Sequence, residues 1–299
     1  MRKRILAFCA ALLILGSTAL PTLAAEPGAG EELTILFTHD MHDHVRPAPA
    51  EGGGEYGGFT RVAALLKEER KNAPGTVVTL DGGDFSMGTL YQTIYTTAAP
   101  ELRLMGAMGY DVTTLGNHEF DYRAQGLADM LNAAAASGDR LPAMVQANYK
   151  PPEDDTASLD AWRNYGISDY TMIERDGLRI AVFGLLGVDA DECAPMSGMV
   201  FEPIADAAER TVAYLEEHES PDFIICLSHS GTENGKGEDY ELAKAVDGID
   251  VIISGHTHTT LNEPIQVNDT LIVSCGEYTQ NLGVLTISKA PEVIVICLW

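Results

Sequence analysis

Short apolar runs alternate along the chain with longer stretches in which apolar residues recur at helical spacing. Apolar runs, most of them rich in β-branched residues, occupy residues 33–37, 76–80, 112–115, 144–147, 223–227 and 251–254. Apolar positions three and four apart characterise residues 59–70, 89–108, 127–136, 204–217 and 240–246. The first pattern predicts strands and the second predicts helices. Their alternation is typical of an α/β fold.

Residues 170–186 carry a hairpin signal. Two β-like runs, at residues 170–174 and 178–186, flank Arg175-Asp176-Gly177. An Asp-Gly pair between such runs is typical of a tight β-turn. Further β-like runs follow at residues 271–274 and 282–288. We therefore expect a mixed sheet, or two sheets packed face to face between helices.

The first 25 residues have the pattern of a secretory signal peptide. Residues 2–4 are basic, residues 5–15 are almost wholly apolar, and small residues precede the expected cleavage after Ala24 or Ala25. The apolar run is shorter than the roughly 20 residues that a membrane-spanning helix needs. We expect export to the periplasm, the cell surface or the exterior, without stable membrane insertion after cleavage. The alternative is an uncleaved membrane anchor.

Composition narrows the class of ligand. The 299 residues carry a formal charge of −25, whereas binding to a nucleic-acid polymer needs a basic stripe. An anionic small substrate would need bound cations to offset this charge. None of the cysteines after the leader forms a C-x-x-C pair, and we expect no disulfide. The sequence does not indicate an oligomeric state.

Seven of the eight histidines lie in four short motifs, each of which directly follows a predicted strand. A fifth motif at a strand end carries carboxylates instead. The five motifs are residues 38–44, 81–84, 116–121, 228–230 and 255–258. Histidine and carboxylate side chains are the common ligands of zinc-like and manganese-like ions. Because loops after separate strands can aim their side chains at one point, the motifs predict a polynuclear metal site.

The first two motifs offer carboxylates and an imidazole. Asp40 and His42 are two residues apart, so they can point to the same side and share an ion. Asp84 has two carboxylate oxygens and could bridge two ions, and the two glycines before it allow a close backbone approach. The alternatives are a polar surface loop for the first motif and an ordinary Asp-Gly turn for the second.

The third motif could combine a ligand with a catalytic group. Asn117 offers a neutral oxygen to an ion, and His118 can donate a proton or stabilise negative charge. Asp121 could hold the ring of His118 in one tautomer. The alternative is a helix start with Asn117 as its N-cap, which leaves His118 unexplained.

The last two motifs offer three more imidazoles. His229 follows a buried strand, where a single histidine can equally be structural. His256 and His258 follow Gly255 and another apolar strand, and their alternative is two exposed loop histidines. The chain has no G-x-S-x-G motif of a serine hydrolase and no Rossmann glycine fingerprint.

The order D-x-H, G-D, G-N-H-E, H and G-H-x-H resembles the calcineurin-like metallophosphoesterases. It is most similar to the exported 5′-nucleotidases, with the UDP-sugar hydrolases and 2′,3′-cyclic phosphodiesterases. The resemblance extends from about residue 33 to residue 288 and includes residues 35–42, 57–61, 83–84, 116–121, 255–258 and 276–278. It implies a four-layer α-β-β-α sandwich of two mixed sheets flanked by helices, with the catalytic domain in residues 26–290.

The resemblance also implies a site for two divalent ions, which could be zinc, manganese, iron or cobalt. One ion would be held by Asp40, His42, Asp84 and His258, and the other by Asp84, Asn117, His229 and His256. A hydroxide between the ions would attack phosphorus in line. His118, oriented by Asp121, would stabilise the developing charge or protonate the leaving group, and Asn117 and His118 would contact the substrate, a phosphate ester of the nucleotide type.

Two features of the chain depart from the family pattern. Asp43 stands where the family often has glycine, so it either supports the ligands or is exposed. Family members usually continue into a second, base-binding domain, whereas this chain ends at Trp299. We therefore expect residues 291–299 to be a truncated or altered tail, with the substrate-binding domain absent. The alternatives to a nucleotidase are a catalytically weak metal-binding fragment and an enzyme with the same core that acts on a different ester.

Overall fold

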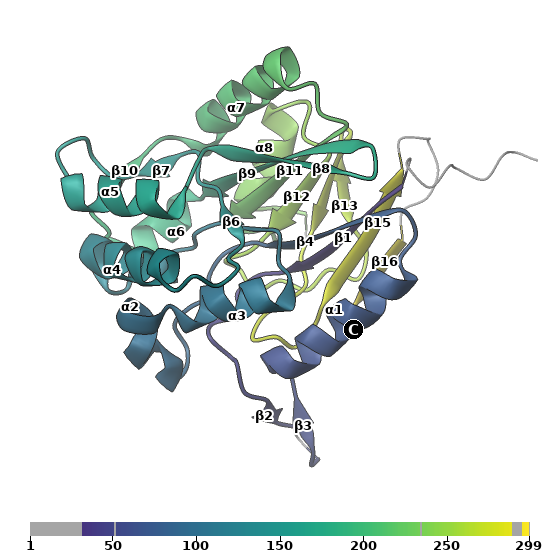
Figure 1. Cartoon of the computed structure of the whole chain (residues 1–299). Helices are drawn as coiled ribbons and strands as arrows, with labels where there is room; N and C mark the ends of the chain where they lie inside the picture. The colour runs from purple at the N-terminus through teal and green to yellow at the C-terminus, as the bar shows by residue number, and fades with distance from the viewer. Residues whose placement is uncertain (1–31, 51, 234, 289–294, 299) are drawn as a thin grey trace, which may run out of the picture.

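The computed structural model describes residues 32–50, 52–233, 235–288 and 295–298, the last four by their backbone alone. Its centre is a pair of six-stranded sheets (Figure 1). The predicted signal peptide and most of the predicted tail lie outside the described residues. Within the described residues, no helix combines the length and the apolar character needed to cross a membrane.

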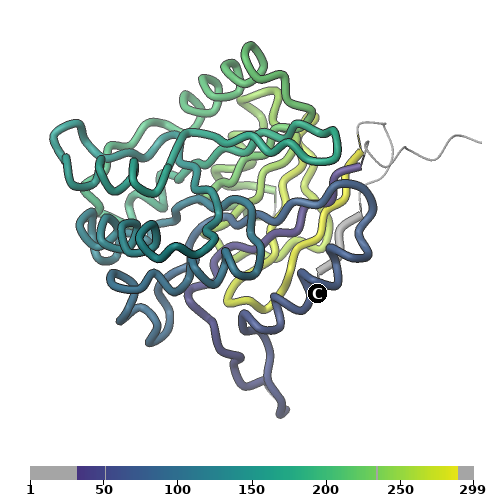
Figure 2. Tube along the Cα trace, viewed as in Figure 1, coloured from purple at the N-terminus to yellow at the C-terminus, as the bar shows by residue number. Residues whose placement is uncertain are grey.

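The first sheet is mixed. Its strands, in spatial order, are β16 (Val295–Leu298), β15 (Gly283–Ser288), β1 (Glu32–Thr38), β4 (Thr76–Asp81), β5 (Val112–Thr113) and β6 (Ala143–Met144). From β1 to β6 neighbouring strands are parallel, whereas β15 is antiparallel to both β1 and β16. Figure 2 shows β1 in purple beside β15 in yellow, so distant parts of the chain meet at the centre of this sheet.

The second sheet is also mixed. Its strands, in spatial order, are β13 (Ile265–Val267), β14 (Thr270–Val273), β12 (Val251–Ser254), β11 (Phe223–His229), β9 (Leu178–Leu186) and β8 (Tyr170–Arg175). The four central strands are parallel and the two edge strands are antiparallel to their neighbours. The predicted hairpin is confirmed, because β8 and β9 pair around Asp176 and Gly177, both with positive φ. Two short ribbons, β2 (Ala48–Pro49) with β3 (Glu55–Tyr56) and β7 (Tyr149–Lys150) with β10 (Val200–Phe201), lie outside the two sheets.

Helices cover the outer faces of both sheets. They are α1 (Phe59–Asn72), α2 (Tyr95–Ala98), α3 (Pro100–Met108), α4 (Arg123–Ala136), α5 (Thr156–Tyr165), α6 (Val188–Cys193), α7 (Ile204–His218) and α8 (Glu238–Ala245), with short 3-10 helices η1 (Leu90–Ile94) and η2 (His118–Phe120). One apolar core lies between the sheets, another under α1 to α4, and a third under α7 and α8. The expected four-layer α-β-β-α sandwich is confirmed.

The prediction of one continuous helix over residues 89–108 was wrong. This segment contains η1, α2 and α3 in succession. Ala99 has a left-handed φ of 43°, and Pro100 begins α3. Proline has no N–H and disfavours helical geometry in the residue before it, so the backbone turns between α2 and α3. α5 and α6 were not predicted.

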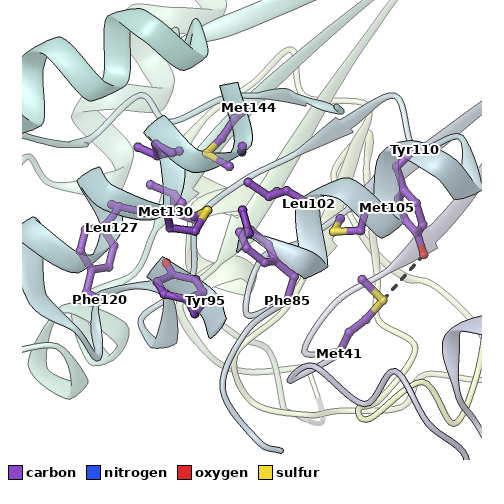
Figure 3. Close-up of a cluster of buried hydrophobic side chains, with 14 of the residues drawn as sticks. Met41, Phe85, Tyr95, Leu102, Met105, Tyr110, Phe120, Leu127, Met130 and Met144 are labelled. Atoms are coloured by element: carbon purple, nitrogen blue, oxygen red, sulfur yellow. Dashed lines mark hydrogen bonds between the residues drawn. The ribbon is translucent and has the colours of Figure 1, made fainter. Parts of the chain in front are cut away.

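The core under α2, α3 and α4 anchors the loops that carry the motifs. Figure 3 shows Met41, Phe85 and Phe120 in this core, and each is at most 3% exposed. Each belongs to or directly follows a motif whose polar residues point elsewhere. The Tyr110 hydroxyl also contacts the Met41 sulfur at 3.8 Å. These buried apolar side chains hold the motif loops against the core, as a rigid site requires.

Glu101 provides a pH-dependent test of this packing. It lies in the first turn of α3 with a buried carboxyl group that has no hydrogen-bond partner among the described residues. Burial above all, together with the charges of Asp43 and Glu119, raises the pKa of Glu101 from 4.5 to about 8. The folded state therefore keeps a proton that the unfolded chain loses, and the contribution of Glu101 to stability falls as pH rises from about 4.5 to about 8.

We expect Glu101→Gln, which stays neutral, to be more stable than the wild type by a margin that grows across this pH window. Urea unfolding at pH 5 and pH 8 measures the margin. The exposed Glu68→Gln variant is the control, with little difference at either pH. An equal margin for Glu101→Gln at both values would contradict the prediction.

Candidate metal centre

The predicted site residues meet at one edge of the two sheets. Asp40 and His42 follow β1, Asp84 follows β4, and Asn117 follows β5, all in the first sheet. His229 ends β11, and His256 and His258 follow β12 of the second sheet. Since β1, β4 and β5 are parallel, as are β11 and β12, their carboxyl ends lie together.

A first cluster joins Asp40, His42 and His258. The Nε2 atoms of the two histidines are 3.0 Å apart. Asp40 Oδ1 lies 3.4 Å from His258 Nε2 and 3.8 Å from His42 Nε2. All three ligand atoms therefore face one point and could hold a metal ion.

A second cluster joins Asp40, Asp84 and His229. His229 Nε2 lies 3.1 Å from Asp84 Oδ2 and 3.9 Å from Asp40 Oδ1. The same Asp84 oxygen is 3.8 Å from His42 Nε2, in the first cluster. Asp84 thus stands between the two clusters, where a bridging carboxylate would be.

The tautomers of these histidines suit metal binding. His42 Nδ1 donates to the Met87 carbonyl and His229 Nδ1 to the Gly82 carbonyl, each at 2.9 Å, and His258 Nδ1 contacts the Glu277 carboxylate. Because a carbonyl only accepts, Nδ1 of His42 and of His229 carries a proton, which leaves Nε2 as the atom that can bind an ion. The Nε2 atoms of His42 and His258, only 3.0 Å apart, are close enough to share either a proton or a metal ion.

One further buried atom suits an ion. Asn117 Oδ1 has no hydrogen-bond partner among the described residues. Asn117 occupies the N-cap position of η2, but its side chain makes no capping hydrogen bond. The N-cap alternative therefore does not account for the asparagine side chain. A buried polar atom without a partner is costly, and a metal ion would remove that cost.

His256 is placed differently from the other predicted ligands. Its Nε2 is 2.8 Å from Asp189 Oδ2, on α6, and only its Nδ1 could serve the central clusters. Its backbone N–H donates to the Asp40 carboxylate at 2.9 Å. Asp189 and Glu277, the carboxylates that orient His256 and His258, were not among the predicted site residues, although residues 276–278 belong to the family resemblance. Both follow parallel strands, β9 and β14, so the same strand-end rule could have found them.

His118 and Asp121 form the predicted pair. His118 Nδ1 lies 3.0 Å from Asp121 Oδ2, and this hydrogen bond is the largest cause that raises the pKa of His118 to about 9. The His118 ring lies 5.1 Å from the ring of His42, and its backbone N–H donates to Asp84 Oδ1. Because the side chain is 40% exposed, it can reach a ligand from solvent.

The structure also explains the two motif histidines that had no expected role. His39 is buried, with Nδ1 2.5 Å from Asp40 Oδ2. Its Nε2 accepts the Cys275 N–H at 2.7 Å, so the proton is on Nδ1 and donates to Asp40. His44 stacks on Tyr278, which in turn packs edge-on against His42 and His258. Both histidines hold ligand-bearing loops in place.

We expect His39→Phe to weaken zinc or manganese binding by about 10- to 100-fold, the usual cost of removing a partner of a ligand. His39→Asn should recover part of the affinity, because its amide can still donate to Asp40. Competition against a chromogenic chelator measures both variants, with circular dichroism to check folding. Equal losses in both folded variants would mean that His39 serves only packing.

The backbone at the site is strained. Left-handed φ values occur at five predicted ligands, namely Asp40 (49°), His42 (45°), Asp84 (52°), His256 (73°) and His258 (55°). Such non-glycine residues cost about 1–3 kcal/mol each and cluster at functional sites. Gly116 is required for a different reason, because a Cβ there would lie 2.1 Å from Asp84 Oδ1.

Asp43 shares this conformation, with a φ of 45°, which accounts for a preference for glycine at its position. The alternative that it is exposed was wrong. Its side chain is buried, and neither carboxylate oxygen has a hydrogen-bond partner among the described residues.

Known proteins are similar to this chain in sequence and in fold. The chain is 34% identical over 278 residues to the trifunctional nucleotide phosphoesterase protein YfkN of Bacillus subtilis, a match covering 84% of this chain and 18% of that protein. It is 32% identical to a probable 5′-nucleotidase of Treponema pallidum, over 86% of this chain and 41% of that protein. It thus spans less than half the length of either relative.

Among solved structures, a 5′-nucleotidase precursor from Thermus thermophilus matches with a TM-score of 0.74 and 26% identity, over 89% of this chain and 54% of that chain. The sequence pattern of calcineurin-like phosphoesterases matches residues 33–260, which include every predicted site residue. The chain therefore belongs to the calcineurin-like phosphoesterase family.

Proposed function

We propose that this protein is an exported hydrolase of phosphate esters, with nucleotides as its substrate class and two divalent ions as its cofactor. The observation that carries the proposal is the convergence of three imidazole nitrogens on Asp40 and Asp84, beside the unpartnered Asn117 oxygen. The nucleotide phosphoesterase and 5′-nucleotidase names of the relatives support the substrate class. The charge of −25 makes bound cations a requirement for an anionic substrate.

The two clusters support a division of the ligands. Asp40, His42, Asp84 and His258 would hold one ion. Asp84, Asn117, His229 and the Nδ1 atom of His256 would hold the other, with Asp84 shared. The mixed nitrogen and oxygen donors suit zinc, manganese, iron or cobalt. When bound, such ions supply positive charge for the phosphoryl oxygens and acidify a water molecule.

The remaining groups act on the substrate. His118 would donate a hydrogen bond or a proton to a phosphoryl or leaving-group oxygen, because its Nε2 is turned away from Asp121. Asp121 would keep the imidazole oriented and stabilise its charge. Asn117, next to His118, would contact the same phosphoryl group.

The test compares an adenosine 5′-monophosphate substrate with a simple aryl phosphate, on protein purified without chelator. We expect turnover of both with manganese or zinc, faster turnover of the nucleotide, loss on chelation and recovery on metal addition. Equal rates would favour action on non-nucleotide esters. Bound metal without turnover above the buffer background would favour a weak metal-binding fragment. Fewer than about one ion per chain, against the two of a dimetal site, would contradict the proposal.

Export is part of the same proposal, with residues 1–25 as signal peptide and residues 26–290 as catalytic domain. Its basis is the basic and then apolar N-terminal pattern. N-terminal sequencing of protein recovered outside the cytoplasm should begin at residue 25 or 26. Recovery of the full chain in the membrane fraction would favour the uncleaved anchor instead.

A further inference from the structure

A group of ligand atoms that includes a thiol lies beside the two central clusters. Asp189, Cys193 and His256 each bring one ligand atom to within 4.8 Å of the others. Asp189 and Cys193 are four residues apart on α6, so they share one face of that helix. His256 reaches them from the loop after β12. Two ligands one helical turn apart and a third from a distant loop form a compact binding set.

The chemistry of this group differs from that of the central clusters. It contains a thiol, whereas the central clusters offer only imidazole, carboxylate and amide atoms. His256 Nε2 and Asp189 Oδ2 are already 2.8 Å apart, while Cys193 and Asp189 are exposed. The Asp189 side chain is 70% exposed, so solvent can supply a fourth ligand. Thiolate, imidazole and carboxylate with one open position suit zinc or a softer ion such as cadmium.

We propose that Asp189, Cys193 and His256 form a separate site for a thiophilic divalent ion, and that occupation of this site inhibits the enzyme. Binding releases the Cys193 thiol proton to solvent. The proton on His256 Nε2 moves to Nδ1, because a neutral imidazole has only one lone pair for a metal. His256 then cannot serve the second catalytic ion. This inhibitory role rests on the proposed function, whereas the binding site does not.

Binding is tested with cobalt(II) on the reduced, full-length protein. We expect a thiolate-to-cobalt charge-transfer absorption in the near ultraviolet whose final intensity corresponds to one thiolate-bound cobalt ion per chain, in addition to any cobalt in the central clusters. Cys193→Ser should abolish the band, since the other two described thiols, Cys226 and Cys275, are buried. The matched control is Glu192→Gln, which removes a neighbouring exposed carboxylate and should keep the band. No band in the wild type, or a band that persists in Cys193→Ser, would overturn the proposal.

Inhibition is tested by cadmium or zinc titration of manganese-loaded enzyme. Cys193→Ser should keep the basal rate and need at least about tenfold more cadmium for half-inhibition, the factor that 1.4 kcal/mol of lost binding energy gives. Equal sensitivity of the wild type and Cys193→Ser would remove the inhibitory role even if the cobalt band is present. A wild type with the band but no phosphoesterase activity under any metal would contradict the proposed function and leave the binding site standing.

Discussion

Replacing Asp84 by alanine is expected to abolish hydrolysis and to remove both ions. Its Oδ2 is 3.1 Å from His229 Nε2 and 3.8 Å from His42 Nε2, so this one oxygen serves both clusters. The stabilisation of transition-state charge by metal ions is worth several kcal/mol, and each 1.36 kcal/mol is tenfold in rate. We therefore expect kcat/KM to fall by about three orders of magnitude or more.

The metal content of Asp84→Ala is best compared with that of His258→Ala. His258 contacts Asp40 and His42, in the first cluster. Elemental analysis should find close to no bound metal in Asp84→Ala and about one ion in His258→Ala, if two ions share Asp84. Both proteins must keep wild-type circular dichroism. A folded Asp84→Ala protein with two ions would exclude a bridging role.

His118→Ala should lower kcat by about 10²- to 10⁴-fold, the usual contribution of a general acid or base, with metal content unchanged. The reason is geometric, because the His118 imidazole is 40% exposed beside the clusters and its Nδ1 is held by Asp121 rather than by a predicted ligand. Asp121→Asn should cause a smaller fall in kcat, since the ring loses its charged partner but stays in place. KM for a nucleotide should change less than kcat in both variants.

His218→Ala is the matched control for His118. His218 is the one histidine outside the motifs, exposed at the end of α7 and stacked on Tyr214. Its removal should leave kcat and KM unchanged. A fall in metal content in His118→Ala would instead assign His118 to ion binding, which its grouping with His42 and Asp84 also allows.

The position of the site could be predicted because strand ends are readable from the sequence. The strands that carry the five motifs occur at the predicted places, and parallel pairing brings their carboxyl ends to one edge. The spacing of apolar residues predicted helices less reliably where the backbone conformation of single residues ends a helix. The turn at Ala99 and Pro100 divides a stretch that is helical by periodicity, because proline steric effects outweigh apolar spacing there.

The partners of the ligands could not be predicted in the same way. Met87, Gly82 and Cys275 act through backbone atoms, which any residue type could supply. His39 is adjacent to Asp40 in the sequence, but its role depends on the backbone of Cys275, more than two hundred residues away. The left-handed backbone at five predicted ligands is likewise a property of the folded loops, because Asp and His adopt it more often than most residues but their presence does not predict it at a given position.

The pairing of β1 with β15 has a consequence for how the protein is made. At a synthesis rate of about 5–20 residues per second, β15 emerges roughly 10–50 s after β1. Until then one edge of β1 has no neighbour, and the early part of the chain exposes apolar surface that favours aggregation. Asp40, His42 and Asp84 also emerge long before His229 and His258. The proposed dimetal site is therefore complete only late in synthesis, and we expect ion loading to take place in the compartment where folding finishes.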